Sequence, residues 1–180
     1  MTSDWHFCHS KSFIWEPRGF KNEWEMNKTI IANYNEVVQP EDDVYCLGDC
    51  MLSNDEEGLK CIKQLKGNLH IIRGNHDSDN RIQLYQSCYN VVEVCEAKFL
   101  RYGKYHFYLS HFPSLCSNYS DGKKLTQKTL NICGHTHTTD PFADWEKGCI
   151  YHCEVDAHEC YPILLDDIIE EMKAKVLYEH

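Results

Sequence analysis

Residues 130–137 read LNICGHTH, a short apolar run that leads directly into a glycine and two histidines. The same arrangement recurs in VYCLGD at 44–49, LHIIRGNHD at 69–77 and HFYLSH at 106–111, and the short segment MTS leads into Asp4 and His6. Short apolar runs of this kind predict strands, and each one delivers a metal-competent side chain at its carboxyl end. Open α/β sheets build their sites at that edge. The sequence therefore predicts an α/β domain with one shared polar site.

The remaining periodic segments predict helices and a pair of strands around this sheet. Residues 22–38, 54–68 and 164–180 each place apolar side chains at helical spacing, and Asn54 or Asp55 is the expected cap of the second helix. The expected apolar face of the first helix consists of Met26, Ile30, Tyr34, Val37 and Val38, and that of the last helix of Ile168, Ile169, Met172 and Val176. Residues 89–110 predict two β-runs joined around Tyr102 and Gly103.

Length and composition restrict the class of protein. A chain of 180 residues suits a single domain, here residues 1–180, and the net charge of −10 makes a nucleic-acid partner unlikely. No apolar run approaches the length of a membrane span, so we expect no membrane partner. An odd count of 11 cysteines without a secretory leader predicts reduced thiols in the cytoplasm.

A cluster of cysteines and histidines near the carboxyl end could mimic a zinc site. It contains Cys149, His152, Cys153, His158 and Cys160, whose spacing matches no paired C-x2-C pattern. Buried cysteines that pack as small hydrophobic residues are the preferred interpretation.

The side chains after the predicted strands form a larger set of possible ligands. They are Asp4, His6, Asp49, Asn75, His111, His135 and His137. Seven donors are too many for one tetrahedral ion and about right for two ions that share a carboxylate. Nitrogen and oxygen donors suit Mn²⁺, Fe or Zn²⁺. Two such ions, roughly 3.5–4 Å apart, can clamp a phosphoryl group for in-line attack.

The chain resembles the calcineurin-like metallophosphoesterases, and within them the small, cap-less bacterial and phage branch. The five blocks that carry the resemblance are DWH at 4–6, GD at 48–49, GNHD at 74–77, SH at 110–111 and GHTH at 134–137. They occur in the order of that family, and the first block continues as DWHFCH. The resemblance implies a four-layer αββα sandwich, with two mixed β-sheets flanked by helices.

The resemblance also implies a role for each residue of the blocks. Asp4, His6 and His137 would hold one divalent ion and Asn75, His111 and His135 the other, with Asp49 bridging them; Mn²⁺ is the expected metal, with Fe or Zn²⁺ as alternatives. His76 would steady the phosphate or protonate the leaving oxygen, and Asp77 would accept the other ring proton of His76. Arg18 could offer a forked donor to phosphate, or could be a solvated loop residue. His9 could contact substrate or pack near the site.

The activity that these roles imply is hydrolysis of a phosphate ester by metal-bound hydroxide. The expected enzyme is a phosphodiesterase or phosphatase, and its partner a small-molecule or nucleotide phosphate ester. Two alternatives remain open: a nuclease with the same metals, and a non-catalytic relative that uses the fold to bind a partner. The sequence does not indicate the oligomeric state.

Overall fold

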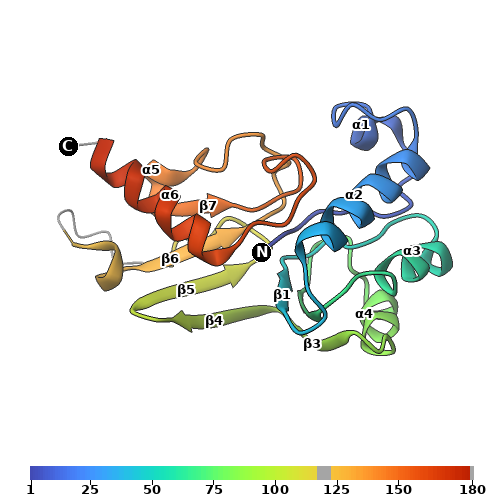
Figure 1. Ribbon diagram of the computed structural model, residues 1–180, viewed down its shortest axis with the longest axis horizontal. Coiled ribbons are helices and arrows are strands. Elements are labelled where there is room, and N and C mark those ends of the chain that lie inside the picture. The colour runs from blue at the N-terminus through green and yellow to red at the C-terminus, as the bar shows by residue number, and fades with distance from the viewer. Residues whose placement is uncertain (117–122, 179–180) are drawn as a thin grey trace.

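The computed structural model describes residues 1–116 and 123–178, which form two β-sheets flanked by helices, as predicted (Figure 1). The first sheet has the order β1-β2-β3 and the second the order β4-β5-β6-β7. The strands are β1 Asp43–Cys46, β2 Asn68–Ile72, β3 Val91–Cys95, β4 Ala97–Tyr102, β5 Tyr105–Ser110, β6 Thr129–Cys133 and β7 Ile150–His152. The helices are α1 Ser12–Trp15, α2 Glu23–Val37, α3 Asp55–Ile62, α4 Asp79–Gln86, the 3₁₀ helix η1 Leu125–Gln127, α5 Trp145–Gly148 and α6 Leu165–Tyr178.

The two sheets differ in strand direction. The described pairings of the three-stranded sheet are parallel, whereas in the four-stranded sheet β4 runs antiparallel to β5 and the other pairings are parallel. The amino-terminal segment connects the sheets, because Thr2 forms a parallel bridge with Cys46 at the end of β1 and Ser3 forms one with Glu154 after β7. It therefore leads into Asp4 from between the two sheets.

The helices largely follow the predicted periodicity. Asn22 and Asn54 cap α2 and α3 by accepting hydrogen bonds from backbone N–H groups, which satisfies donors that the helix leaves unpaired. Of the predicted apolar face of α2, Met26, Ile30 and Tyr34 are buried, whereas Val37 at the last turn is 48% exposed. Helix α3 also ends earlier than predicted, at Ile62.

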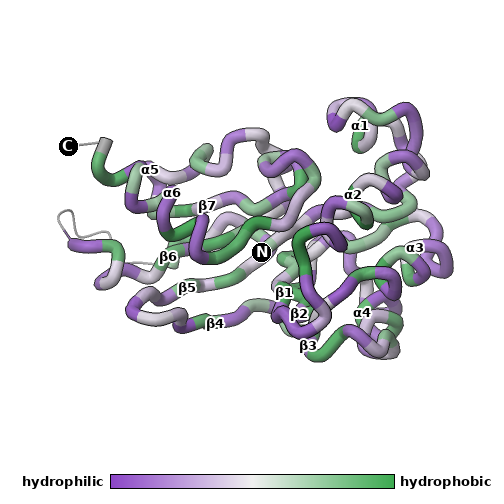
Figure 2. The backbone as a smooth tube through the Cα atoms, in the orientation of Figure 1, coloured by the Kyte–Doolittle hydropathy of each residue, from purple (hydrophilic) through white to green (hydrophobic). Residues whose placement is uncertain are grey.

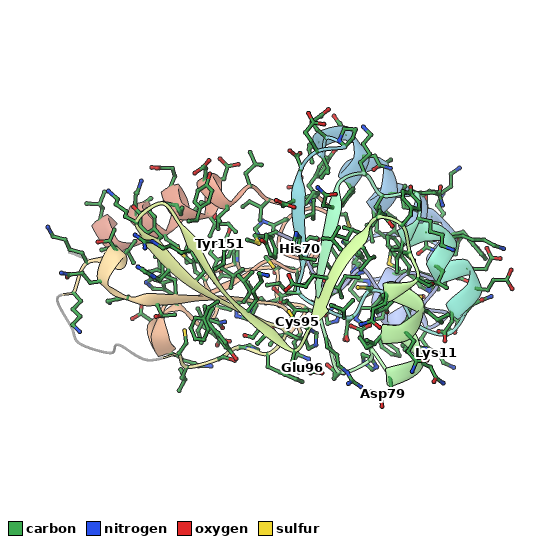
Figure 3. The ribbon with its side chains drawn as sticks, turned by 90° about the horizontal axis from the view of Figure 1, so that it is seen from below. Lys11, His70, Asp79, Cys95, Glu96 and Tyr151 are labelled. Atoms are coloured by element: carbon green, nitrogen blue, oxygen red, sulfur yellow. The ribbon has the colours of Figure 1, made fainter. Side chains whose placement is uncertain are left out.

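Residues 89–110 form three strands where two runs were predicted. The first run divides at Glu96, and β3 belongs to the three-stranded sheet while β4 belongs to the other (Figure 3). Only Glu96 separates the two strands, so the apolar pattern continues across the change of sheet. The predicted turn is confirmed, with Gly103 at φ +57° between β4 and β5. Left-handed backbone of this kind favours glycine.

Two hydrophobic clusters hold the layers together. One packs α2, α3 and α4 against the three-stranded sheet, and the other packs α6 against the four-stranded sheet. Hydropathy alternates along α6 (Figure 2). Of its predicted apolar face, Ile168, Ile169 and Met172 are buried and Val176 is partly buried. All 11 cysteines are free thiols, and eight of them are buried. Among the described helices, none is long and apolar enough to cross a membrane.

Candidate metal centre

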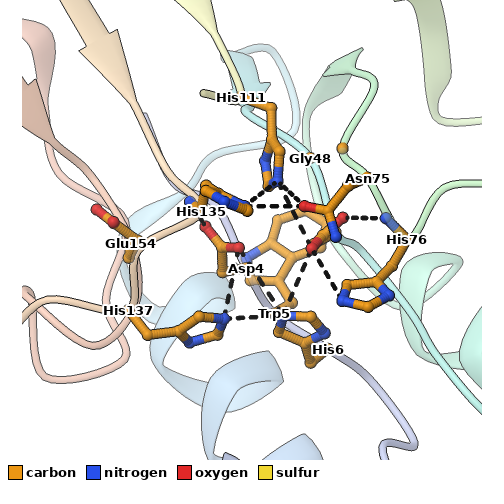
Figure 4. A network of polar contacts seen from close by, with 12 residues as sticks. Asp4, Trp5, His6, Gly48, Asn75, His76, His111, His135, His137 and Glu154 are labelled. Carbon is orange, nitrogen blue, oxygen red and sulfur yellow. Dashed lines mark hydrogen bonds and ion pairs between the residues drawn. The ribbon is translucent and has the colours of Figure 1, made fainter. Parts of the chain in front are cut away.

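The predicted ligands converge from five separate segments of the chain (Figure 4). Asp4 and His6 follow the amino-terminal segment, Asp49 follows β1, Asn75 follows β2, His111 follows β5, and His135 and His137 follow β6. Backbone hydrogen bonds tie these loops together, because Asp4 N–H donates to the Gly48 carbonyl and Gly134 N–H donates to the His111 carbonyl, each at 3.0 Å. The common edge of the strands therefore builds the site, as predicted.

Five of the ligand residues have left-handed backbone. The φ angles are +57° at Asp4, +49° at His6, +54° at Asp49, +81° at His135 and +53° at His137. Non-glycine residues adopt this region rarely and at an energetic cost, so its repetition at one site indicates that the surrounding structure imposes it. The consequence is a change of chain direction at these positions, which turns their side chains towards the centre.

Asp4, His6 and His137 form the first donor group. Asp4 Oδ1 lies 3.8 Å from His6 Nε2 and 3.7 Å from His137 Nε2, and the two ring nitrogens are 3.1 Å apart. Donors about 2.1 Å from one ion lie roughly 3.0 Å apart at octahedral angles and 3.4 Å apart at tetrahedral angles. Asp4 Oδ1 is buried and has no hydrogen-bond partner. An unpaired buried carboxylate oxygen facing two ring nitrogens fits a cation site.

Asn75, His111 and His135 form the second donor group. Asn75 Oδ1 lies 2.8 Å from both His111 Nε2 and His135 Nδ1, and these two nitrogens are 3.2 Å apart. The other ring nitrogen of His111 donates to the Leu47 carbonyl at 2.8 Å, which leaves Nε2 free of its proton for a metal. The set of donors and their spacing again fit a divalent ion.

Asp49 lies between the two donor groups. Its Oδ2 is 3.7 Å from His6 Nε2 in the first group and 3.6 Å from His111 Nε2 in the second. Its other oxygen accepts a hydrogen bond of 2.9 Å from the His76 backbone N–H. The side chain is 3% exposed, so the carboxylate has little access to water. This is the position in which a bridging carboxylate was predicted.

Electrostatics favour a bound cation at these carboxylates. Burial raises the pKa of Asp4 to about 6 and also raises the pKa of Asp49, while burial and neighbouring positive groups lower the pKa of His6. Each of these pKa shifts arises because burial disfavours the charged form of a poorly hydrated group. A divalent ion would reverse the effect on the carboxylates, because it stabilises their charged form at close range.

Asp156 supports His137 from behind and was not found by sequence reasoning. His137 Nδ1 donates to Asp156 Oδ2 at 3.0 Å, which turns Nε2 towards Asp4. Burial alone would lower the pKa of His137, but the hydrogen bond to Asp156 and the nearby carboxylates outweigh burial and raise it. Asp156 lies four residues beyond β7, a three-residue strand whose apolar run was too short to predict.

Arg18 pairs with Asp156, which corrects both interpretations of this arginine. Its Nε and Nη2 donate to the two Asp156 oxygens at 2.8 and 2.7 Å, and Nη2 also donates to the Asp4 carbonyl at 2.8 Å. The Arg18 side chain is 3% exposed, so it is neither a solvated loop residue nor a free fork for phosphate. It positions the first donor group instead.

Asp77 does not contact the ring of His76, so the predicted pairing was wrong. Asp77 Oδ2 accepts from the backbone N–H groups of Asp49 and Gly74 at 2.8 and 2.9 Å, and Oδ1 accepts from the Tyr85 hydroxyl at 2.7 Å. The buried carboxylate thus points away from the adjacent side chain and ties two loops of the site together. Its role is positional.

His76 and His9 lie on the same side of the centre as His6. His76 Nε2 is 3.9 Å from Asp49 Oδ2, and the His76 side chain is 46% exposed, so the ring is open to an incoming molecule. His9 is buried and packs edge-on against His6 with ring centroids 5.6 Å apart. Its Nδ1 accepts from the Lys11 backbone N–H at 3.1 Å.

A buried polar cluster supports the loop that carries His135 and His137. Glu154 accepts from the Thr136 hydroxyl and from His152 at 3.0 Å each, and the other ring nitrogen of His152 pairs with Asp144 at 3.1 Å. His152, one of the two histidines of the possible zinc cluster, therefore belongs to this network. Within the described ranges, the groups of His, Cys, Asp and Glu that could hold a metal are the sets around Asp4 and include no cysteine.

Comparisons with known proteins agree with this geometry. A family model of the calcineurin-like phosphoesterase superfamily domain matches residues 1–152. An uncharacterised protein of Methanocaldococcus jannaschii is 33% identical over 184 residues, covering 98% of this chain and 93% of that protein. The crystal structure of a protein of unknown function from Aquifex aeolicus has a TM-score of 0.70 at 26% identity, covering 94% of this chain and 96% of that one. The chain therefore belongs to the calcineurin-like phosphoesterase superfamily.

Proposed function

We propose that this protein hydrolyses phosphate esters with two divalent ions, one held by each donor group. The observation that carries the proposal is the position of Asp49 Oδ2, 3.7 Å from His6 Nε2 and 3.6 Å from His111 Nε2. A carboxylate placed this way can bind two cations at once. When bound, such ions polarise phosphoryl oxygens and make a bound water acidic enough to attack near neutral pH. Mn²⁺ is the metal we expect, and Fe or Zn²⁺ would suit the same donors.

The protein's own residues position the reacting groups. Water adds to phosphorus, the bond to the leaving oxygen breaks, and the products are an alcohol and a phosphate with one ester arm fewer. His76 is half-exposed beside Asp49 and can donate a proton to the leaving oxygen or a hydrogen bond to the phosphate. Asp77 accepts a hydrogen bond from the Asp49 backbone N–H and so positions that residue, and His9 packs edge-on against His6.

The partner that we propose is a small-molecule or nucleotide phosphate ester in the cytoplasm. Two divalent ions facing two aspartates and a hydroxide leave about one positive charge for an anionic substrate. An acidic protein can therefore bind a phosphate at this place. The net charge of −10 disfavours a nuclease, which needs a basic track for a polyanion.

Hydrolysis by metal-stripped protein reloaded with Mn²⁺ tests the proposal. We expect cleavage of bis-p-nitrophenyl phosphate or p-nitrophenyl phosphate that Asp49→Ala and His111→Ala abolish. His76→Ala should keep both metals and lose most turnover, whereas His106→Ala, at an exposed histidine on β5, should keep both metals and turnover. Full activity of Asp49→Ala would refute the assignment. Two bound ions without turnover on either ester would favour the alternative of a binding protein.

A further inference from the structure

Two exposed aromatic rings pack against histidines at or next to the metal centre. Phe13 packs edge-on against His9, with ring centroids 5.2 Å apart, and Phe112 packs edge-on against His135 at 4.7 Å. Phe13 is 67% exposed and Phe112 is 50% exposed. Single exposed apolar side chains are ordinary on protein surfaces. These two differ because Phe112 contacts a histidine of the second donor group and Phe13 contacts His9, which packs against the first. We call Phe13 and Phe112 the aromatic pair.

The members of the aromatic pair flank different donor groups. Phe13 reaches the first group through His9, whose ring packs against His6 at 5.6 Å. Phe112 contacts both histidines of the second group, at 5.0 Å from His111 and 4.7 Å from His135. In Figure 4, His6 and His111 lie on opposite sides of the centre. A substrate arm that extends past His9 would therefore meet Phe13, and one that extends past His135 would meet Phe112.

The arginines in and beside the metal-binding loops are already paired with carboxylates. Arg18 binds Asp156 at 2.7 Å. Arg73 and Arg81, which flank the loop after β2, bind carboxylates of Asp79 and Asp55 at 2.7 and 2.8 Å. Each of these guanidinium groups therefore already has a carboxylate partner. The charge available to substrate is then about one unit, which matches a phosphodiester monoanion better than a dianionic monoester or a polyphosphate.

We infer that the substrate is a phosphodiester monoanion with a planar ring on each ester arm, and that the aromatic pair stacks these rings. The inference rests on the proposed function, because it assigns a substrate class to the same centre. His76 lies on the side of His6, with ring centroids 5.6 Å apart, so the leaving arm departs on that side. Phe13 therefore stacks the leaving ring, and Phe112 stacks the ring that the product retains. Nucleobases and aryl groups have the required flat faces.

Substrates with one leaving group and different retained arms separate the two rings. We would compare bis-p-nitrophenyl phosphate with methyl p-nitrophenyl phosphate, using Mn²⁺-loaded protein. Phe112→Ala should lower kcat/KM about fivefold to tenfold on the bis-aryl diester and less than about twofold on the methyl ester. Phe13→Ala should lower kcat/KM by a similar factor on both. Phe99→Ala, at a ring on β4 that is 74% exposed, is the matched control and should change neither rate.

Aromatic replacement separates stacking from a general loss of structure. Phe112→Trp should keep the selectivity for the bis-aryl diester, whereas Phe112→Leu should lose it although it remains apolar. Mn²⁺ titration calorimetry should give the same stoichiometry for all of these variants. If Phe13→Ala and Phe112→Ala match the Phe99→Ala control on both diesters, the inference is refuted while the proposed function stands.

Binding of a phosphoryl compound that cannot be cleaved tests the inference without turnover. Diphenylphosphinate and dimethylphosphinate are monoanions with carbon–phosphorus bonds and no ester to hydrolyse. Diphenylphosphinate should bind the Mn²⁺-loaded protein at least about tenfold more tightly than dimethylphosphinate, and each alanine variant of the aromatic pair should lose about fivefold of that affinity. Such binding without hydrolysis of any diester would refute the proposed function, and would show separately that the aromatic pair stacks planar arms of a bound phosphoryl monoanion. Equal binding of the two phosphinates would overturn the inference.

Discussion

Replacement of Asp156 by asparagine should weaken the fold and the first donor group together. Asp156 accepts two hydrogen bonds from Arg18 and one from His137, and the side chains of Arg18 and Asp156 are only 3% and 10% exposed. Breaking a buried ion pair typically costs about 3–5 kcal/mol, because the partner charge stays buried without compensation. Asparagine keeps one acceptor oxygen, so we expect a loss of stability at the lower end of this range, about 3 kcal/mol. A domain of this kind is stable by about 5–15 kcal/mol in total.

Urea unfolding of metal-free protein at pH 7 measures this loss. The pairing with His137 and Arg18 holds the pKa of Asp156 well below its ordinary value of 3.8, against the effect of burial. A lowered pKa in the folded state means that the stabilisation is present above pH 3.8 and is lost as the pH falls further. The difference between wild type and Asp156→Asn should therefore shrink in acid. It should also shrink as the pH rises above 6.5, because Asp156 raises the pKa of His137 and the stabilisation of the protonated ring is lost when His137 loses its proton.

Metal affinity gives the second readout for Asp156→Asn. Loss of a carboxylate behind a metal-binding histidine typically costs about 10- to 100-fold in affinity, so one Mn²⁺ should bind about that much more weakly in calorimetry. Asp55→Asn is the control, because its partner Arg81 is more exposed, at 15%, and the pair should contribute less than about 1 kcal/mol. Equal stability losses in the two variants, or unchanged Mn²⁺ affinity in Asp156→Asn, would refute the reasoning.

Three further predictions concern the buried groups of the centre. The pKa of Asp4 is raised from 3.8 to about 6, so in metal-free protein the folded state holds this proton more tightly than the unfolded state. The free energy of unfolding should therefore fall by about 3 kcal/mol as the pH rises from 3.8 to 6, relative to Asp4→Asn. Urea unfolding at a series of pH values checks this prediction. Gly134→Ala should weaken Mn²⁺ binding more than about tenfold in calorimetry, since its methyl group would meet Asp4 Oδ2 and Ser3. Asp77→Asn should cost about 2–4 kcal/mol in urea unfolding, because two backbone donors and the Tyr85 hydroxyl compete for one acceptor, whereas Tyr85→Phe should cost about 1 kcal/mol.

The strands and the convergence of their ends could be predicted from sequence because both depend on local patterns. A short apolar run identifies a strand, and parallel strands bring the loops at their carboxyl ends to one edge of the sheet. This was enough to bring Asp4, Asp49 and His111 together, although they are far apart in the chain. The change of sheet at Glu96 could not be predicted, because strand pairing is a long-range property and one residue carries no turn pattern.

The supporting residues could not be predicted, because their role depends on direction and burial. Asp77 directly follows His76 in sequence, yet its carboxylate accepts from the backbone groups of Asp49 and Gly74. Asp156 and Arg18 are 138 positions apart and meet only because the fold brings the loop after α1 close to the segment after β7. A charged side chain in a single sequence has no local mark that separates a buried ion pair from a solvated one.

The spacing of His135 and His137 shows how local strain becomes a functional arrangement. In an extended strand, residues two apart point to the same side, so both rings would serve one ion. The backbone is left-handed at both positions, with φ of +81° and +53°, so the two side chains point in different directions. The His135 ring lies against Asn75, and the His137 ring lies against Asp4. The strain is offset by hydrogen bonds such as that from His135 N–H to Asp4 Oδ2 at 2.9 Å. The loop therefore supplies two neighbouring donor groups from three consecutive residues, which a relaxed strand could not do.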